Sequence, residues 1–359
     1  MEKKYILAIN PGSTSTKVSL FLGTKEVSTQ KLELTQDDLK QFDNIIDQYQ
    51  FRLDIIKKWI EKEGINPSEL KAVVGRGGLL RPMPSGTYIV TDTMVEDLII
   101  GIQGQHASNL GGLLAKGFGD DLGIPSYIVD PVAVDEFSQV ARISGLKELP
   151  RKSLVHALNI KAVCHRYAKE NNLNLEEINL IVAHLGGGIS VAPILKGRIV
   201  DVNNANHMGP FSPERAGGLP VGDVVKMCYS GDYTEAQMKK LIQGEGGMMS
   251  YLGTFDGREV VNRINNGDEY AKLIYEAMSY QIAKEIGSLG PVLKGDVKQI
   301  IITGGLAYSN YLVDYIKDMI SFIAPVTVYS GEDEMDALNR GVLRVLEGEE
   351  KAKIYEEEV

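Results

Sequence analysis

The sequence predicts an α/β protein built from two halves that follow the same plan. Short segments rich in Ile, Val and Leu, most of them ended by glycine, alternate with longer segments in which apolar residues recur at the helical period. The succession strand, polar turn, strand, strand, helix, strand and Gly-Gly occurs near the start of the chain and again in its second half. A length of 359 residues suits two domains of ordinary size. We therefore expect a duplicated architecture of two lobes.

The first lobe is expected to comprise residues 1–150. Its elements are, in chain order, strands at 5–10, 18–22 and 26–34, a helix over 37–63, a strand at 70–75, a helical segment over 93–119, a strand at 127–130 and a helical segment over 133–143. The apolar residues of 37–63 fall three or four positions apart, which predicts one long amphipathic helix. The strand at 70–75 runs into Gly77-Gly78.

The second lobe is expected to comprise residues 151–334, and it repeats the plan. Its elements are a helix over 153–169, strands at 180–185, 189–195 and 198–202, helices over 221–229, 236–242 and 270–289, and a strand at 299–303 that ends in Gly304-Gly305. A C-terminal segment, 335–359, holds a helix over 336–347 that can pack back on the first lobe, and an acidic tail that is expected to be solvated.

Composition narrows the choice of partner and compartment. The formal net charge is −10 and the sequence pI is about 5.2, which disfavours nucleic acid as a partner. No apolar run approaches the roughly 18 residues of a membrane span. Cys164 and Cys228 stand singly, without the spacing of a disulfide framework or a zinc site. We expect a cytoplasmic protein that binds small molecules.

Two polar turns occupy equivalent places in the two halves, each between the first and second strand. The first spans 11–17 and includes Lys17, and the second is Gly186-Gly187-Gly188. Such turns direct backbone N–H groups and hydroxyls at one point, which suits a phosphate chain. Either turn alone is more often an ordinary hairpin turn, but their duplication favours phosphate binding. A Walker A loop and a dinucleotide-binding Gly-x-Gly-x-x-Gly turn after the first strand are both missing.

A family resemblance rests on nine strings that occur in the same order along the whole chain. Residues 9–17 resemble the first signature of the carboxylate (acyl) kinases, and 183–190 resemble their phosphate turn. The other matching strings are 74–78, 105–110, 129–130, 155–156, 214–218, 303–305 and 331–334. The chain thus resembles the acetate and butyrate kinases, within the superfamily of acetate and sugar kinases, Hsp70 and actin. The string Glu-Arg-Ala-Gly-Gly-Leu-Pro at 214–220 is more similar to the butyrate kinases.

The resemblance implies two ribonuclease-H-like (actin-like ATPase) lobes with an active-site cleft between them. It also implies reversible, in-line phosphorylation of a short-chain fatty acid by ATP, which gives an acyl phosphate and ADP. A fatty acid with a pKa near that of Glu, about 4.3, is ionised at pH 7, so no general base is needed. The obstacle is repulsion between two anions, which cations and hydrogen-bond donors must relieve.

Residue roles follow from the same resemblance. The catalytic residues would be Arg76, Arg215, His156, His184 and Asp130, and the acyl substrate would contact Arg76, Val155, Gly78 and His106. The nucleotide would contact Asn10, Ser13, Ser15, Lys17, His184, Gly186, Gly187, Gly188, Gly304, Gly305 and Leu306. Magnesium would be held mainly through ATP phosphates and water, with Glu334 and Asp130 as the acidic residues and Glu332 as an alternative to Glu334. No metal site made by protein ligands alone is expected.

The acyl pocket departs from that of acetate kinases at two places. Val155 stands where acetate kinases usually carry Phe, and Arg76 is followed by Gly77-Gly78 where they have bulkier residues. Both differences predict a roomier pocket, which favours butyrate, isobutyrate or similar acids over acetate.

Two other functions stay open at this point. A non-catalytic, nucleotide-switched module of the same superfamily would need a further peptide-binding domain, and the chain ends soon after its last predicted helix. A sugar kinase would need a carboxylate base, and Asp130 offers one. Family members commonly form dimers through the C-terminal lobe. The apolar stripe of 270–289 suits such a homo-oligomer, but it suits packing on its own sheet at least as well.

Overall fold

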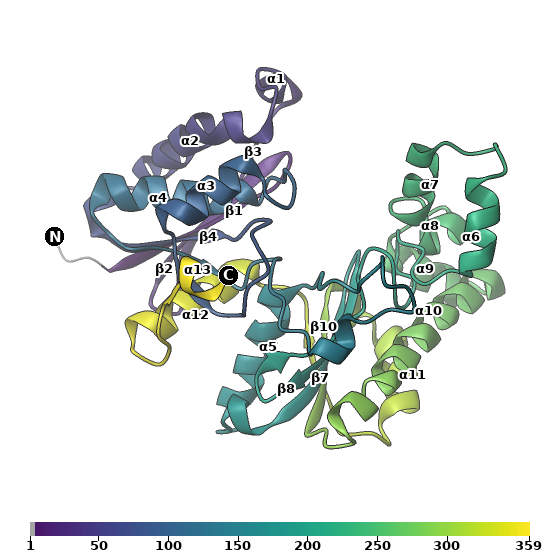
Figure 1. Ribbon diagram of the computed structural model, residues 1–359. Helices are drawn as coiled ribbons and strands as arrows, with labels where there is room; N and C mark the ends of the chain where they lie inside the picture. Colours follow the sequence, from purple (N-terminus) through teal and green to yellow (C-terminus); the bar gives the residue numbers. More distant parts are fainter. Residues whose placement is uncertain (1–3) are drawn as a thin grey trace. The chain divides into compact units, whose positions relative to one another are not determined.

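The computed structural model describes residues 4–359, which form two compact units (Figure 1). The first unit contains the chain up to Asp135 together with Asp333–Val359, and the second contains Glu136–Glu332. The predicted cut near residue 150 differs from this division. Glu136 accepts a hydrogen bond from the backbone N–H of Ile199, and Ser138 donates to the carbonyl of Val200, so the segment after Asp135 pairs with the second unit.

The first unit is built on a seven-stranded sheet in the order β12-β5-β6-β4-β1-β2-β3. Its strands are β1 (Tyr5–Pro11), β2 (Ser15–Leu22), β3 (Lys25–Glu33), β4 (Leu70–Arg76), β5 (Thr87–Ile89), β6 (Ser126–Val129) and β12 (Lys353–Ile354). Strands β1, β2 and β3 form the predicted antiparallel meander, and β4 pairs with β1 and with β6 in parallel.

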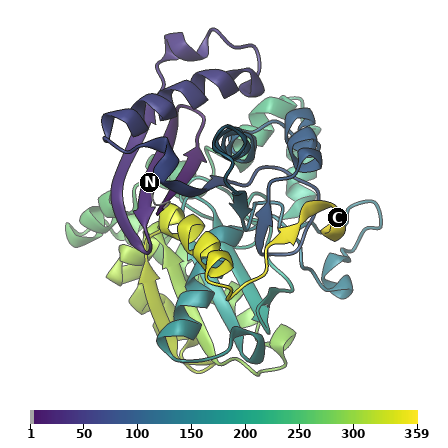
Figure 2. The ribbon, with the colours of Figure 1, turned by 90° about the vertical axis from the view of Figure 1, so that its left-hand side faces the viewer.

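Helices cover both faces of this sheet. They are α1 (Gln36–Leu39), α2 (Tyr49–Lys62), α3 (Asp92–Ile100), α4 (Asn109–Leu122), α12 (Glu334–Leu346) and α13 (Tyr355–Glu358), with short 3-10 helices η1 (Ile45–Gln48) and η2 (Pro67–Glu69). Leu7 and Ile9 of β1 share one apolar core with α2 and α4. The opposite face of β1, β4 and β6 receives α12, as Figure 2 shows from the side.

Three helix predictions in this region are wrong in detail. The segment 37–63 is divided into α1, η1 and α2, because Asn44 forms a capping box with Asp47 and thereby starts a new helix. The segment 93–119 is divided into α3 and α4, since Gly101 ends α3 in the left-handed conformation. The segment 133–143 contains only the 3-10 helix η3 (Gln139–Arg142).

The second unit is built on a five-stranded sheet in the order β11-β10-β7-β8-β9. Its strands are β7 (Asn179–Leu185), β8 (Ile189–Leu195), β9 (Arg198–Ile199), β10 (Gln299–Gly304) and β11 (Val326–Ser330). An antiparallel meander is again followed by a strand that pairs with its first strand in parallel. The order β3-β2-β1-β4-β6 of the first unit thus recurs as β9-β8-β7-β10-β11, which confirms the predicted duplication.

The helices of the second unit enclose its sheet. They are α5 (Ala157–Glu170), α6 (Val221–Cys228), α7 (Glu235–Ile242), α8 (Gly247–Leu252), α9 (Gly257–Asn265), α10 (Glu269–Ser288) and α11 (Asn310–Ile320), with 3-10 helices η4 (Leu175–Glu177), η5 (Pro291–Leu293) and η6 (Gly305–Tyr308). Ile274, Met278 and Ile282 of α10 are buried in the core of this unit, whereas Leu273 is 60 % exposed. Most of the apolar stripe of α10 therefore faces its own sheet.

The C-terminal segment is an integral part of the first unit. Asn339 of α12 donates to the carbonyl of Gly23, and Lys353 and Ile354 add a parallel strand beside β5. Tyr355 is completely buried, and its hydroxyl donates to Asp97 at 2.8 Å. The acidic residues Glu356, Glu357 and Glu358 that follow are exposed, as expected of a solvated tail, whereas the chain just before them is anchored through Tyr355. Among residues 4–359, no helix has the length and hydropathy to cross a membrane.

Candidate active site

One cluster of predicted site residues lies in the first unit, at one edge of its sheet. Strands β1 and β4 are parallel neighbours, with Ile9 opposite Gly75, so Asn10 and Arg76 leave their strands side by side. The carboxylate of Glu334, the first residue of α12, accepts a hydrogen bond from the side-chain amide of Asn10 and forms an ion pair with the guanidinium of Arg76. The structure therefore brings together an amide, a guanidinium and a carboxylate from three elements.

The glycines beside Arg76 allow two backbones to approach closely. A Cβ atom at Gly75 would lie 1.9 Å from the carbonyl oxygen of Gly111 in α4. At Gly77 it would lie 2.4 Å from Cβ of Pro131, and at Gly78 it would lie 2.4 Å from Oδ1 of Asn109. The expectation that Gly77 and Gly78 leave room for an acyl chain is therefore wrong at these Cβ positions. These glycines instead fix the backbone that carries Arg76.

His106 precedes α4 in the same unit, and its ring is close enough to Arg76 to respond to that charge. Its Nδ1 lies 2.8 Å from the hydroxyl of Ser108. The pKa of His106 is lowered from its ordinary value, mainly because burial disfavours the cation and further because the positive charge of Arg76 repels it. The charge of Arg76 therefore acts on His106, which places this histidine beside the Arg76 cluster.

Asp130 follows β6 and is held in an uncommon backbone conformation, with φ at 39°. Its carboxylate is 3 % exposed and accepts hydrogen bonds from the hydroxyl of Ser85 at 2.6 Å and the N–H of Gly86 at 2.8 Å. Strained residues of this kind are concentrated at functional sites. A role for Asp130 in catalysis or metal binding stays a prediction.

The turn between β1 and β2 holds the other predicted phosphate contacts of the first unit. Lys17 pairs with Asn10 across the hairpin, and Ser13 and Lys17 are exposed while Ser15 is partly exposed. Behind the turn lies Arg52 of α2, which sequence reasoning missed and which donates to the carbonyls of Ser13 and Ser15. Its spacing from Ile56 places it on the apolar face of the predicted helix, and this was the available signal.

A second cluster lies in the second unit and centres on two stacked histidines. His184 is the second-last residue of β7, and His156 occupies the N-cap position of α5. Their ring centroids are 4.0 Å apart with an interplanar angle of 15°. Nδ1 of His184 lies 3.0 Å from Oδ1 of Asn159, and Nδ1 of His156 lies 2.9 Å from the hydroxyl of Ser190. Both rings are therefore held in fixed orientations.

Glu332 and the glycine turn lie against this histidine pair. Oε1 of Glu332 is 3.5 Å from Nε2 of His184. A Cβ atom at Gly186 would lie 3.2 Å from the same nitrogen, so the β7–β8 turn passes directly beside the ring. Glu332 thus lies beside His184, whereas Glu334 lies beside Arg76. This placement favours Glu334 as the acid of the Arg76 cluster.

Arg215 lies across the glycine turn. A Cβ atom at Gly188 would meet its guanidinium at 2.1 Å, and one N–H of Arg215 donates to the carbonyl of Ala205 at 3.1 Å. Its buried Nε has no hydrogen-bond partner among the described residues. Burial lowers the pKa of Arg215, and the carboxylate of Glu214 offsets part of that shift. The site therefore holds a desolvated cation with an unused donor, which suits an anionic ligand.

The remaining predicted nucleotide contacts lie at the end of β10, which runs parallel to β7. Thr303 is opposite His184, so Gly304 and Gly305 leave the sheet at the same edge as the histidine. Gly304 has φ at 93°, and a Cβ atom there would lie 2.3 Å from the carbonyl oxygen of Leu185, whereas Gly305 faces open space. Leu306 follows in η6 and is partly exposed.

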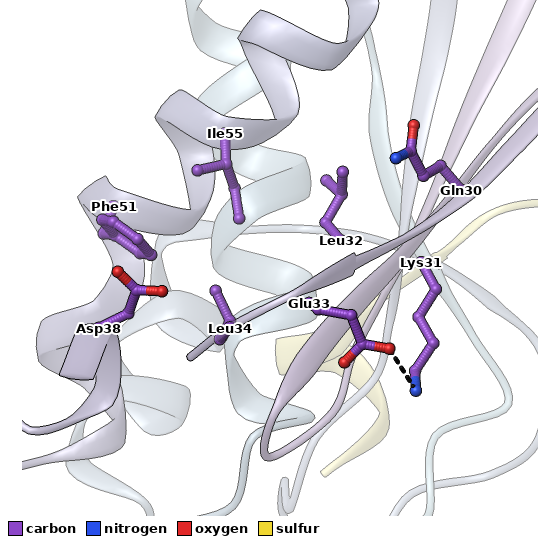
Figure 3. Close-up of a pocket in the computed structure, with 8 residues that line it drawn as sticks. All are labelled: Gln30, Lys31, Leu32, Glu33, Leu34, Asp38, Phe51 and Ile55. Carbon is purple, nitrogen blue, oxygen red and sulfur yellow. Dashed lines mark ion pairs between the residues drawn. The ribbon is translucent and has the colours of Figure 1, made fainter. Parts of the chain in front are cut away.

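Val155, the last predicted substrate contact, is only 2 % exposed and immediately precedes His156. A surface hollow of the first unit lies elsewhere, between β3 and the helices α1 and α2 (Figure 3). None of the predicted site residues lines it, and its polar groups include an ion pair between Lys31 and Glu33 at 2.7 Å. The chemistry is therefore expected at the two clusters and not in this hollow.

Duplicated lobes with a polar turn after the first strand, and with arginine, histidine and carboxylate groups gathered at strand ends, define a phosphotransferase of the actin-like ATPase fold. Residues 146–327 match the Acetokinase family. A probable butyrate kinase 2 of Caldanaerobacter subterraneus is 61 % identical over 350 residues, which cover 98 % of this chain and 99 % of the relative.

Two further comparisons agree. Butyrate kinase 1 of Clostridium acetobutylicum is 52 % identical over 351 residues, 98 % of this chain and 99 % of the relative. The crystal structure of Porphyromonas gingivalis acetate kinase has the same fold, with a TM-score of 0.80 at 19 % identity over 96 % of this chain and all of that one. The chain belongs to the acetokinase family. It is a carboxylate kinase that uses ATP. This assignment is favoured over the two alternatives, a non-catalytic nucleotide-switched module and a sugar kinase.

Proposed function

We propose that the protein transfers the γ-phosphoryl group of ATP to butyrate, or to a branched acid such as isobutyrate, and forms an acyl phosphate and ADP reversibly. The observation that carries the proposal is the pair of clusters around Arg76 and the His156–His184 stack, each at the strand ends of one lobe. The names of the two butyrate kinase relatives support the choice of acid.

The clusters supply what the reaction needs. The ionised carboxylate attacks phosphorus directly, so cations must offset the repulsion between the two anions. Arg76 is paired with Glu334 in this structure, and we propose that the acyl carboxylate replaces Glu334 as its partner. Arg215 and His184 donate hydrogen bonds to the equatorial oxygens as charge accumulates there. The stack and Asn159 keep the His184 ring in place.

The residues present fit a magnesium ion held mainly by phosphates. Among residues 4–359 there is no group of three or more His, Cys, Asp or Glu side chains arranged to hold a metal ion. Mg²⁺ commonly uses one or two carboxylates together with phosphate oxygens and water, and Glu334 beside Asn10 provides such a carboxylate. When bound, the cation neutralises charge on the β and γ phosphates.

Val155 is proposed to set the length of the acyl chain. Phe at this position would fill volume that Val leaves to the substrate. Each methylene buried is worth about 0.8 kcal/mol, so butyrate should be preferred over acetate by roughly 10-fold to 100-fold.

We also propose a cytoplasmic homo-oligomer. Cys164 and Cys228 stand singly in the sequence, without the spacing of a disulfide framework, which suits a reducing compartment. Tyr270, Leu273 and Tyr280 are 51 %, 60 % and 46 % exposed on α10 and offer an apolar contact between second units. Light scattering would show a monomer if this part of the proposal is wrong.

The decisive experiment is hydroxylamine trapping of acyl phosphate with ATP and Mg²⁺. The substrates would be acetate, propionate, butyrate, isobutyrate, isovalerate and a panel of sugars, with Arg215→Ala as the inactive control. Hydroxamate from the four-carbon and five-carbon acids, lost in the variant, is the expected result. If the protein bound ATP but formed no product from any acid, the proposal would be overturned, and a sugar kinase would become the next candidate.

A further inference from the structure

Arg52 is a buried cation whose hydrogen-bond partners are all neutral. It is 0 % exposed in α2. Its Nε and one terminal nitrogen donate to Oε1 of Gln48, at 3.1 and 2.7 Å. The other donations go to the carbonyls of Ser13 and Ser15, at 3.4 and 3.0 Å, and to the hydroxyl of Thr16 at 2.9 Å. All five N–H groups are used, yet no carboxylate among residues 4–359 forms an ion pair with Arg52.

This arrangement is energetically unusual. A buried guanidinium normally has a carboxylate partner, because desolvation of an uncompensated charge costs several kcal/mol. Burial alone lowers the pKa of Arg52 to about 10, with no opposing charge to offset it. Neutral side chains of similar size would hold the turn without this cost, so the positive charge itself calls for an explanation.

The location of Arg52 supplies that explanation. Three of the residues that accept its hydrogen bonds, Ser13, Ser15 and Thr16, lie in the β1–β2 turn or at the start of β2. Ser13 and Lys17 of the turn are exposed, while Arg52 lies behind the turn in the interior. An anion on the outer side of the turn is therefore separated from the Arg52 charge by little water, and the attraction between them is screened less than at the surface.

We propose that Arg52 is a positioning residue for the phosphate chain of the nucleotide, a step that rests on the proposed function. It fixes the shape of the β1–β2 turn through Ser13, Ser15 and Thr16, and its uncompensated charge attracts phosphate to the outer side. Linkage makes the effect mutual: a phosphate on the turn stabilises the buried cation, so nucleotide binding raises the stability of the first unit.

A substitution that neutralises the charge without removing a donor tests this proposal. Gln48→Glu places a carboxylate on Arg52 and keeps every hydrogen bond of the guanidinium. The expected result is a rise of about tenfold in the Kd for ATP, a smaller rise for ADP and the smallest for AMP, because the attraction grows with phosphate charge. Gln50→Glu is the matched control, since it makes the same change of charge on the exposed side of α2.

Further measurements separate charge from shape. Inorganic tripolyphosphate should raise the Tm of the wild type more than that of Gln48→Glu. Arg52→Lys should retain more ATP affinity than Arg52→Gln. Unchanged Kd values for all three nucleotides in a folded Gln48→Glu protein would overturn the proposal, and so would equal losses in Gln50→Glu. A wild type that binds ATP without making acyl phosphate would overturn only the proposed function, whereas failure to bind ATP would overturn both.

Discussion

The guanidinium of Arg76 forms an ion pair with the carboxylate of Glu334 across a sequence separation of 258 residues. Both side chains are partly buried: 21 % of the Arg76 side chain and 30 % of the Glu334 side chain are exposed. In the proposed reaction Arg76 binds the acyl carboxylate and Glu334 lies beside the cation on the phosphates. The ion pair therefore neutralises both side chains while the ligands are absent. In this proposal the acyl carboxylate releases Glu334 when it binds Arg76, and the cation releases Arg76 when it binds near Glu334.

Removal of either partner should have a different consequence. Arg76→Ala should lower kcat by about 10²-fold to 10³-fold, since the cation that orients the acyl carboxylate and offsets its repulsion from the phosphates is lost. Glu334→Gln should keep the contact with Asn10 but raise the Mg²⁺ concentration needed for half-maximal rate by about 10-fold. Hydroxamate formation at a series of Mg²⁺ concentrations measures both. Glu347→Gln, exposed at the end of the same helix, should behave as wild type. A kcat within a few-fold of wild type in Arg76→Ala would contradict the assigned role.

The sequence predicted the strands and the duplicated meander well because these patterns are local. The division at Asn44 was missed because the helical spacing of apolar residues continues through Ile45 and Ile46. The capping box between Asn44 and Asp47 nevertheless interrupts the helix there. The segment 133–143 has helical spacing but only one 3-10 turn forms. Periodicity indicates which residues face a core, and caps decide where each helix begins.

The site shows a second limit of sequence reasoning. Strand ends place Asn10 and Arg76 at one edge, and the family resemblance favoured Glu334 over Glu332 as the acidic residue, but the sequence does not show that Glu334 contacts these two side chains. The sequence shows that Gly78 has no side chain, which was interpreted as room for the substrate. It does not show that atoms of Asn109 occupy that space. Such contacts depend on the tertiary packing of distant segments.

Val155→Phe should move substrate preference toward acetate. The added ring is expected to occupy the acyl pocket and to lower kcat/KM for butyrate by roughly 10-fold to 100-fold relative to acetate. Because Val155 is buried, the added ring also overpacks its surroundings, and a control must separate this effect from specificity. Val163→Phe, also at a buried position of α5, makes the same change away from His156. An unchanged ratio of butyrate to acetate in a folded Val155→Phe enzyme would show that this residue does not line the pocket.

Tyr355→Phe should destabilise the first unit. The hydroxyl of Tyr355 donates to Asp97 and accepts from the backbone N–H of Arg81, so its removal leaves two groups without this partner and costs about 1–3 kcal/mol. Urea unfolding followed by the fluorescence of Trp59, the single tryptophan and a core residue of this unit, gives the free energy of unfolding. Tyr229→Phe, 88 % exposed, should change it little. Equal values for the two variants would mean that the C-terminal segment contributes little.

His106 should make the stability of the first unit depend on pH in a defined direction. Its pKa in the folded protein is below the ordinary value of 6.5, because of burial first and Arg76 second. Above about pH 6.5 both states are neutral and His106 has no effect. As the pH falls through that value the unfolded chain takes up the proton first, so stability decreases until the folded state is protonated too. Trp59-monitored unfolding between pH 8 and pH 5 should therefore show a shallower decline in His106→Gln than in His165→Gln, a control on α5 of the other unit. Identical declines in the two variants would rule out this contribution.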